Sequence, residues 1–276
     1  MMYSSITQDN ERKDIFMQLQ KLKGLIHGVK VQIFPTSNLN LLKVVPKFIA
    51  NVKEFSKLGG KIDVFTPILD EFETPAGVMR GAYFHHDLLI ARQIFERNPK
   101  RHIDVGSRID GFVAHVASFR EIEIIDIRKF ESNVHQQILS IQFDFSGIGK
   151  TPPVTADSVS CLNTLEHFGL GRYNDPIDLN GHIKGFNNLI SILEPGGILY
   201  VAIPVSNVAT VFFNAHRTFL VDEILTWSED RNVLKLIRYD YVDAKGELHL
   251  DIEISDTPDE YGSSQCVGIY TFLKSN

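Results

Sequence analysis

The sequence predicts an α/β fold, a mostly parallel sheet with helices on both faces, preceded by a helical N-terminal segment. From residue 83 onward, short apolar runs alternate with helical stretches, which is typical of βαβ units. Hydrophobic residues make up 43% of the 276-residue chain, a normal share for a packed core. Two cysteines are too few for a disulfide framework, so packing must hold this core together.

The N-terminal segment, residues 1–79, is expected to be a helical cap or a dimerisation segment. Apolar residues recur at helical spacing over 9–22 and again over 39–58, where Gly59-Gly60 ends the second pattern. The α/β domain is predicted to span residues 80–276.

Within this domain, a helix is expected over 85–97, ending before Asn98-Pro99. The strand-like and helical runs that follow it occupy 102–105, 111–118, 122–127, 138–143, 158–163, 180–193 and 198–203. A loop and helix near 218–228 then lead to strand-like runs at 235–243, 247–254 and 265–273. A turn joins the first two of these runs, so the core is expected to close with an antiparallel hairpin.

Composition and signals narrow the function classes. The chain has 28 basic and 34 acidic residues and a net charge of −6, which is not typical of a protein that follows nucleic-acid phosphates. Residues 195–216 lack charges but contain Pro-Gly-Gly and polar residues, so we expect a buried strand and a loop, not a membrane span. The N-terminus has no secretory signal, and two free cysteines fit a cytoplasmic protein.

A ligand site is expected at the carboxyl ends of the strands, where strand order reverses. The run 104–111 reads Asp-Val-Gly-Ser-Arg-Ile-Asp-Gly. Gly106 allows a tight turn out of the first strand. Asp126 ends the next strand 20 residues later, a spacing at which a carboxylate can bind both hydroxyls of an adenosine ribose.

Three nucleotide cofactors compete for this turn. A P-loop is rejected because two apolar residues follow Gly111, where Lys and Ser or Thr are required. A nicotinamide dinucleotide is disfavoured because Arg108 occupies the position of the second glycine of GxGxxG. S-adenosylmethionine has no phosphates, and Asp104, Gly106 and Asp126 can supply the turn and the two acidic groups that it needs.

The runs HIDVGSRIDGFVAHV, IEIIDIR, DSVSCLNTLEHFGLGRY and LEPGGILYVAIPV resemble the class I S-adenosylmethionine-dependent methyltransferases, over roughly residues 80–276. More narrowly, DVGSRIDGFVAHV and NAHRTF resemble a subfamily of unknown function first defined on nematode proteins. Its bacterial members often accompany surface-polysaccharide genes. The resemblance implies a Rossmann-like fold with S-adenosylmethionine as the cofactor.

The resemblance also implies which residues bind the cofactor: Asp104, Gly106, Ser107, Arg108, Asp126, Asp144 and Asn163. Asp126 matches the residue that binds the ribose, and Asp144 the residue beside the adenine amino group. Both also fit ordinary turn chemistry. The chain departs from the family at Arg108, where a second glycine is usual; a longer side chain can contact the cofactor carboxylate or block the pocket.

Candidate acceptor-side residues follow the fourth and fifth strands. His167 and His216 are candidates for a general base, and Glu166 and Arg217 for contacts with the acceptor. Each also fits a structural loop role. No metal site is expected: neighbouring residues of a helix point in different directions, so His85-His86-Asp87 does not converge on one ion.

The predicted function is transfer of a methyl group to a hydroxyl of a sugar or polysaccharide precursor, with a small-molecule or glycan acceptor. One alternative is a protein on the same fold that binds the cofactor, or serves a structural role, without catalysis. Another is a nicotinamide-dependent sugar enzyme. The chain lacks the YxxxK pair of short-chain sugar dehydrogenases, because Ile177 stands four residues after Tyr173.

Overall fold

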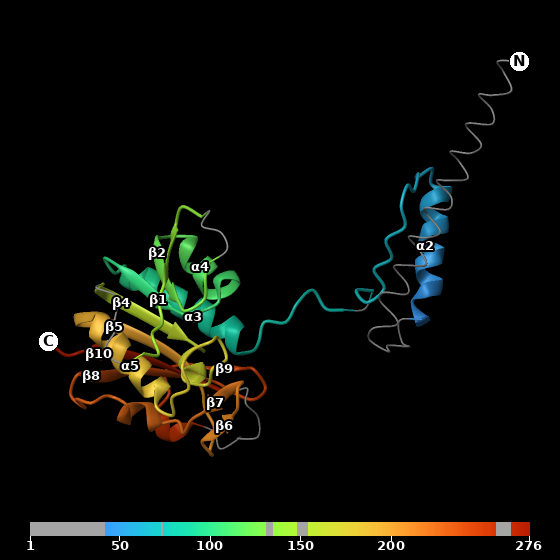
Figure 1. Ribbon diagram of the computed structural model, residues 1–276. Coiled ribbons are helices and arrows are strands. Elements are labelled where there is room, and N and C mark those ends of the chain that lie inside the picture. Colours follow the sequence, from blue (N-terminus) through green and yellow to red (C-terminus); the bar gives the residue numbers. More distant parts are fainter. Residues whose placement is uncertain (1–41, 73, 131–134, 148–153, 258–265) are drawn as a thin grey trace, which may run out of the picture. The chain divides into compact units, whose positions relative to one another are not determined.

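The computed structural model describes residues 42–276 except 73, 131–134, 148–153 and 258–265 (Figure 1). The chain divides into two compact units, Met1–Val78 and Met79–Asn276. The helix predicted over 9–22 lies outside the described residues. The capping or dimerisation role of the N-terminal segment stays a prediction.

In the first unit, the helix predicted over 39–58 is present as α2 (Val45–Lys57). A proline in its first turn fits the helix start, where the missing N–H would have no partner. Val45 and Phe48 pack with Val44 and Phe72 around Leu69, the one buried residue of this small cluster in the described part of the chain.

The second unit contains a central sheet covered by helices (Figure 1). Its helices are α3 (Ala82–Arg97), α4 (Ala114–Ala117) and α5 (Gly181–Ile192). Its sheet strands are β1 (His102–Val105), β2 (Ile122–Asp126), β3 (Ile138–Gln142), β4 (Ala156–Leu162), β5 (Leu193–Pro204), β8 (Leu234–Val242), β9 (Leu248–His249) and β10 (Val267–Lys274). Strands β6 (Thr210–Phe212) and β7 (His216–Thr218) form a separate ribbon.

The strand order is β3-β2-β1-β4-β5-β10-β8-β9. Neighbouring strands from β3 to β5 are parallel, and β10 runs antiparallel to both β5 and β8. The predicted mostly parallel sheet with a C-terminal antiparallel hairpin is confirmed. Strand order reverses between β1 and β4, which places the carboxyl ends of these two strands side by side.

Two expectations need correction on the C-terminal side. The helix expected near 218–228 is a single 3-10 turn, Glu223–Thr226, preceded by the β6–β7 ribbon. Phe219, Ile224 and Trp227 are all buried here, so packing sets the path of the chain in place of helical periodicity. The strand expected over 247–254 is limited to the two residues of β9.

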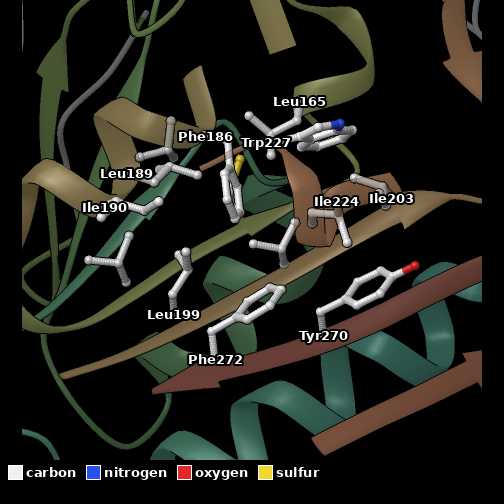
Figure 2. Close-up of a cluster of buried hydrophobic side chains, with 14 of the residues drawn as sticks. Leu165, Phe186, Leu189, Ile190, Leu199, Ile203, Ile224, Trp227, Tyr270 and Phe272 are labelled. Carbon is white, nitrogen blue, oxygen red and sulfur yellow. The ribbon is translucent and has the colours of Figure 1, made fainter. Parts of the chain in front are cut away.

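Alternating side chains of β5 divide the core between the two faces of the sheet. Leu199 packs with residues of α5, whereas Tyr200 packs with residues of α3 and α4. Figure 2 shows Phe186 and Leu189 of α5 in the same cluster as Leu199 and Tyr270. Burial of each such side chain stabilises the fold by roughly 1.5–3 kcal/mol. The sheet is therefore a rigid platform for the loops at its strand ends.

No helix in the described ranges is long and apolar enough to cross a membrane. The uncharged stretch 195–216 forms most of strand β5, as expected, and the start of the β6–β7 ribbon where a loop was expected.

Candidate functional site

A cavity of about 580 Å³ lies at the carboxyl ends of the parallel strands, where the sequence places the ligand site. Its volume is within the range of small-molecule sites. Residues from four strand ends line it: Gly106 after β1, Asp126 at the end of β2, Asp144 after β3 and Asn163 after β4. The β6–β7 ribbon contributes His216.

Gly106 forms the turn out of β1. Its φ of +75° lies in the left-handed region that favours glycine. A Cβ atom at this position would overlap the side chain of Thr164 after β4. The backbone of the turn therefore comes close to the neighbouring strand end, and only glycine fits both its conformation and its surroundings.

Asp104 and Ser107 were expected to bind the cofactor, but neither lines the cavity. Asp104 is buried, and its carboxylate accepts hydrogen bonds from Ser107 N (3.0 Å), Ser107 Oγ (2.7 Å) and Ser160 Oγ (2.5 Å). Burial raises the pKa of Asp104 to about 6, against the opposing effect of these hydrogen bonds. The buried carboxylate thus finds its partners in the turn, so both residues shape the turn beneath the cavity wall.

Asp126 and Asp144 both line the cavity, as their predicted roles require. Arg128 donates to Asp126 through its backbone N (2.8 Å), Nε (2.9 Å) and Nη2 (2.6 Å). Asp144 Oδ1 accepts from Ser146 N (2.8 Å) and Ser146 Oγ (2.6 Å). A carboxylate has about four acceptor sites, so each group retains capacity for a ligand.

Arg108 lines the cavity without filling it. Its side chain is about half exposed, pairs with Asp110 at 3.0 Å, and lies over the ring of Tyr83 at 5.1 Å. Tyr83, in the first turn of α3, also lines the cavity. Arg108 is therefore placed to meet a ligand group near the Gly106 turn.

Glu166 and His167 belong to a 3-10 turn, Leu165–His167, on the other side of the cavity. His167 Nδ1 lies 2.7 Å from the Ala215 carbonyl oxygen, and its Nε2 lies 3.7 Å from Glu166 Oε1. Because a carbonyl only accepts, we assign the ring proton to Nδ1. Burial, reinforced by the charge of Arg172, lowers the pKa of His167 to about 4, so the ring is neutral at pH 7.

Glu166 is buried, and its Oε2 has no hydrogen-bond partner among the described residues. Burial raises the pKa of Glu166 to about 8, so the carboxyl group is largely protonated at pH 7. Glu166 and His167 therefore place a neutral acid and a neutral imidazole next to each other in the cavity wall.

His216 completes this side of the cavity from strand β7. Its ring stacks on Phe212 at a centroid distance of 4.8 Å, and its Nε2 has no partner in the described part of the chain. Burial and then the charge of Arg172 lower its pKa. The two candidate bases share this wall, since His167 binds the backbone of Ala215, the residue before His216.

Arg217, suggested by the sequence as an acceptor contact, lies away from the cavity wall. It is buried, does not line the cavity, and donates to the carbonyl oxygens of Phe168 (2.6 Å) and Asp178 (3.2 Å). Successive side chains of a strand point to opposite faces, so His216 and Arg217 of β7 face different surroundings. Arg217 ties the β6–β7 ribbon to the segment after β4.

Sequence reasoning missed Arg128, Arg172 and Tyr173, which all line the cavity. The guanidinium groups of Arg128 and Arg172 lie 4.6 and 5.2 Å from the centroid of the Tyr173 ring. Arg172 Nη1 also donates to the Ala215 carbonyl at 2.8 Å. The run Gly-Leu-Gly-Arg-Tyr-Asn-Asp, at 169–175, was a usable signal, because it is loop chemistry directly after a strand end.

Across the described residues, no group of three or more His, Cys, Asp or Glu side chains is arranged to hold an ion. His86 Nδ1 lies 2.9 Å from Asp87 Oδ1 within α3, and both residues are buried.

Comparison with known protein families finds a match over part of the chain. Residues 112–222 match DUF268. This family is described as a Caenorhabditis protein of unknown function, and the match runs from α4 to the segment after β7. The resemblance predicted from the sequence is therefore confirmed. No curated protein sequence matches the chain significantly.

Solved methyltransferase structures share the fold of the second unit. The Burkholderia thailandensis 1,6-didemethyltoxoflavin-N1-methyltransferase, with bound S-adenosylhomocysteine, aligns with a TM-score of 0.50 and 11% identity over 71% of this chain and 80% of that chain. N-methyltransferase NodS from Bradyrhizobium japonicum gives 0.46 and 9% over 71% and 89%. An O-methyltransferase from a Brevibacillus brevis polyketide synthase gives 0.48 and 14% over 69% and 71%. The second unit, which contains the matched residues 112–222, therefore has the Rossmann-like fold seen in the 1,6-didemethyltoxoflavin-N1-methyltransferase structure.

Proposed function

We propose that this protein binds S-adenosylmethionine and transfers its methyl group to a hydroxyl of a sugar or polysaccharide precursor. One observation carries the proposal. The cavity lies where strand order reverses, and Gly106, Asp126 and Asp144 line it from three successive strand ends. This is the arrangement that an adenosine-containing ligand requires in an open α/β sheet.

The residues present fit this cofactor. Gly106 lines the cavity, and the absence of a Cβ atom there makes room for the Thr164 side chain, which lines the cavity beside it. Asp126 would accept hydrogen bonds from the ribose hydroxyls, and Asp144 would bind the adenine amino group. Phe143, next to Asp144 in the chain, also lines the cavity. Arg108, near the Gly106 turn, would bind the carboxylate of the methionine moiety. No phosphate-binding residues are needed.

Bound S-adenosylmethionine supplies a methyl group on a sulfonium; when an acceptor oxygen takes this group, both electrons of the S–C bond stay on sulfur and the hydroxyl proton leaves. The protein has two tasks in this step. Its walls hold the acceptor in line with the methyl group, which is worth several kcal/mol, and a side chain receives the proton.

We assign the proton acceptor to His216 and a positioning role to His167. His216 lines the cavity, and its buried Nε2 has no hydrogen-bond partner among the described residues, so an acceptor hydroxyl that reaches it would be its first partner. His167, with its pKa lowered to about 4, is a weak base. Its Nδ1–H holds the Ala215 carbonyl instead and fixes the backbone beside His216. Glu166, protonated at neutral pH, can donate a hydrogen bond to the acceptor.

Two arguments support a sugar as the acceptor. Bacterial members of the subfamily that this chain resembles often accompany surface-polysaccharide genes, and the acceptor side of the cavity is polar. The acceptor-side wall offers hydrogen-bonding groups on Asn163, Glu166 and His216 that lack partners among the described residues. A hydroxyl-rich ligand can satisfy such groups. The N-terminal unit would cap this cavity or mediate dimerisation.

A calorimetric titration of the full chain with S-adenosylmethionine and S-adenosylhomocysteine tests the proposal. Micromolar binding, about −8 kcal/mol, is expected for the wild type, with no binding of NADH. Asp126→Ala should abolish this binding. Asp63→Ala is a matched control, because Asp63 forms an exposed ion pair with Lys61 in the first unit. Failure of both sulfur compounds to bind, or full binding by Asp126→Ala, would overturn the proposal.

A cofactor-binding protein without catalysis is a second candidate, favoured by the weak basicity of His167. It predicts tight cofactor binding with no methyl transfer to any sugar or nucleotide sugar. Incubation with cofactor labelled at the methyl group, followed by a search for labelled product, separates the two candidates.

A further inference from the structure

We propose that the methyl acceptor carries an anionic group, a carboxylate or a phosphate, and that Arg172 binds it. This inference rests on the proposed function, since it identifies the class of acceptor for the same cavity. It follows from the distribution of charge over the cavity wall, which differs sharply between the two sides.

Three arginines line the cavity, and two of them have carboxylate partners. Arg108 pairs with Asp110 at 3.0 Å, and Arg128 pairs with Asp126 at 2.6 Å. Arg172 has a different set of contacts. It donates to the Ala215 carbonyl and lies against the Tyr173 ring, but it forms no ion pair with any described carboxylate.

Two acidic residues near Arg172 form no ion pair with it. Glu166 is largely protonated at pH 7 because burial raises its pKa to about 8. Asp175 is buried, and its carboxylate accepts hydrogen bonds from three backbone N–H groups of its own loop: Gly169 (2.7 Å), Gly171 (3.3 Å) and Tyr173 (3.1 Å). Arg172 is thus a cation without a carboxylate ion-pair partner among the described residues.

The charge of Arg172 acts on the acceptor side of the cavity. It contributes to the lowered pKa of both His167 and His216, after burial. The guanidinium is also held in place, because the Ala215 carbonyl and the Tyr173 ring fix its position. A guanidinium that is already oriented loses less conformational freedom when it binds a carboxylate or phosphate, and such charge-assisted pairs are the strong ones.

The carboxylate of the cofactor is the competing ligand for Arg172. Arg108 is better placed for that carboxylate, because it belongs to the turn that contains Gly106. Arg172 instead shares the Ala215 carbonyl with His167 and stands next to the candidate base. The cavity therefore offers one cation to each end of the reaction, and the second points to an acidic sugar or a phosphorylated sugar.

The test uses the full chain saturated with S-adenosylhomocysteine. D-glucuronate, D-glucose 1-phosphate, D-glucose and inorganic phosphate are titrated by calorimetry or by NMR. We expect at least one anionic sugar to bind about tenfold or more tightly than glucose, the strength of a charge-assisted pair. Arg172→Gln should remove this preference, and Arg172→Lys should retain part of it. Arg92→Gln, which changes an exposed arginine that pairs with Glu96 and does not line the cavity, should leave the preference unchanged. The two anionic sugars distinguish a carboxylate from a phosphate, and inorganic phosphate tests the anion alone.

Equal or undetectable binding of anionic and neutral probes by the wild type would overturn the inference. It would also fall if Arg172→Gln weakened S-adenosylhomocysteine at least tenfold but left 5′-methylthioadenosine, which lacks the carboxylate, unchanged; Arg172 would then bind the cofactor. Absence of cofactor binding in the wild type would overturn the proposed function instead, and the same sugar titrations without cofactor would still decide the role of Arg172.

Discussion

The two sides of the cavity are built by different kinds of contact. On the cofactor side, carboxylates bind partners two or three residues away, as in Asp104 with Ser107 and Asp144 with Ser146, and Asp104 has one further partner, Ser160, 56 positions away. On the acceptor side, the contacts join residues more than 40 positions apart. His167 binds the Ala215 carbonyl across 48 positions, and Arg217 binds the Phe168 carbonyl across 49.

The cofactor side of the cavity is therefore formed by the strand ends and their turns, whereas the acceptor side depends on contacts with the β6–β7 ribbon. The carboxylates of Asp104 and Asp144 have protein partners in their own turns, and Asp104 also has Ser160 of the neighbouring strand, so the shape of these turns does not require a ligand. The acceptor side leaves Glu166 Oε2 and His216 Nε2 without partners among the described residues. Buried polar atoms without partners are costly, so a ligand that pairs with them is bound the more tightly.

Gly106→Ala should have the largest effect, because it breaks the cofactor side at its tightest point. The new Cβ would overlap the Thr164 side chain, and the positive φ adds strain. We expect S-adenosylhomocysteine affinity to fall about 100-fold or more, and the free energy of unfolding to fall by about 2 kcal/mol. Calorimetry and urea denaturation measure the two quantities.

Gly196→Ala is the matched control, since Gly196 has nearly the same φ, +74°, but lies away from the cavity and meets only the Asn276 side chain. It should lose some stability and keep the cofactor affinity. Equal loss of affinity in both variants would show that backbone strain, and not the approach of the Gly106 turn to Thr164, explains the result.

The same contrast explains what could be predicted from the sequence. Gly106, Asp126 and Asp144 stand at or just after the ends of three predicted strands, so the strand pattern places them at one edge of the sheet. His167 was found by its position after β4. Nothing local shows that Ala215 would reach it, because that contact depends on how the ribbon folds back.

Arg217 was predicted on the acceptor side and lies elsewhere, whereas Arg172 was missed. The physical reason is the same for both. The sequence shows an arginine beside His216, but not that β7 would turn it toward backbone carbonyls. Arg172 looked like an ordinary loop residue until the structure placed its guanidinium at the Ala215 carbonyl. Asp104 was misplaced because a buried acid next to a glycine turn can serve either a ligand or the turn itself.

Glu166→Gln should sharpen the comparison through pH. The pKa of Glu166 is raised to about 8 in the folded protein, from an ordinary value near 4.5. Its contribution to stability is therefore fully present below pH 4.5 and is lost as pH rises through about 8, by at most about 1.4 kcal/mol per pH unit. Glutamine does not titrate, so the stability of the variant relative to wild type should rise by on the order of 2–3 kcal/mol between pH 5 and pH 8.

Urea denaturation of both proteins at several pH values measures this change. Asp104, whose pKa is also raised by burial, titrates in both proteins, so its contribution cancels in the difference. A difference that stays constant from pH 5 to pH 8 would mean that Glu166 is ionised in the folded protein, and the neutral acceptor side would lose its basis.

Arg217→Met should show that long-range contacts hold the acceptor side together. The change removes the donors to the Phe168 and Asp178 carbonyls and leaves these groups without their present partner. We expect a loss of about 2 kcal/mol in the free energy of unfolding. Arg172→Met, which removes a guanidinium from the cavity wall, should change stability by less than about 0.5 kcal/mol. Thermal denaturation of the two variants in parallel makes the comparison, and equal losses would contradict it.

Arg108→Gln should have the smallest effect and marks the boundary between the two sides. Arg108 is about half exposed and already pairs with Asp110, so solvent screens its attraction for a cofactor carboxylate. A contribution of about 0.5–1 kcal/mol corresponds to a two- to fivefold loss of S-adenosylhomocysteine affinity. The affinity for 5′-methylthioadenosine, which has no carboxylate, should not change. If both ligands weakened equally, Arg108 would act by shaping the turn. If both bound more tightly, the Arg108 side chain would be blocking part of the pocket that the usual glycine leaves open.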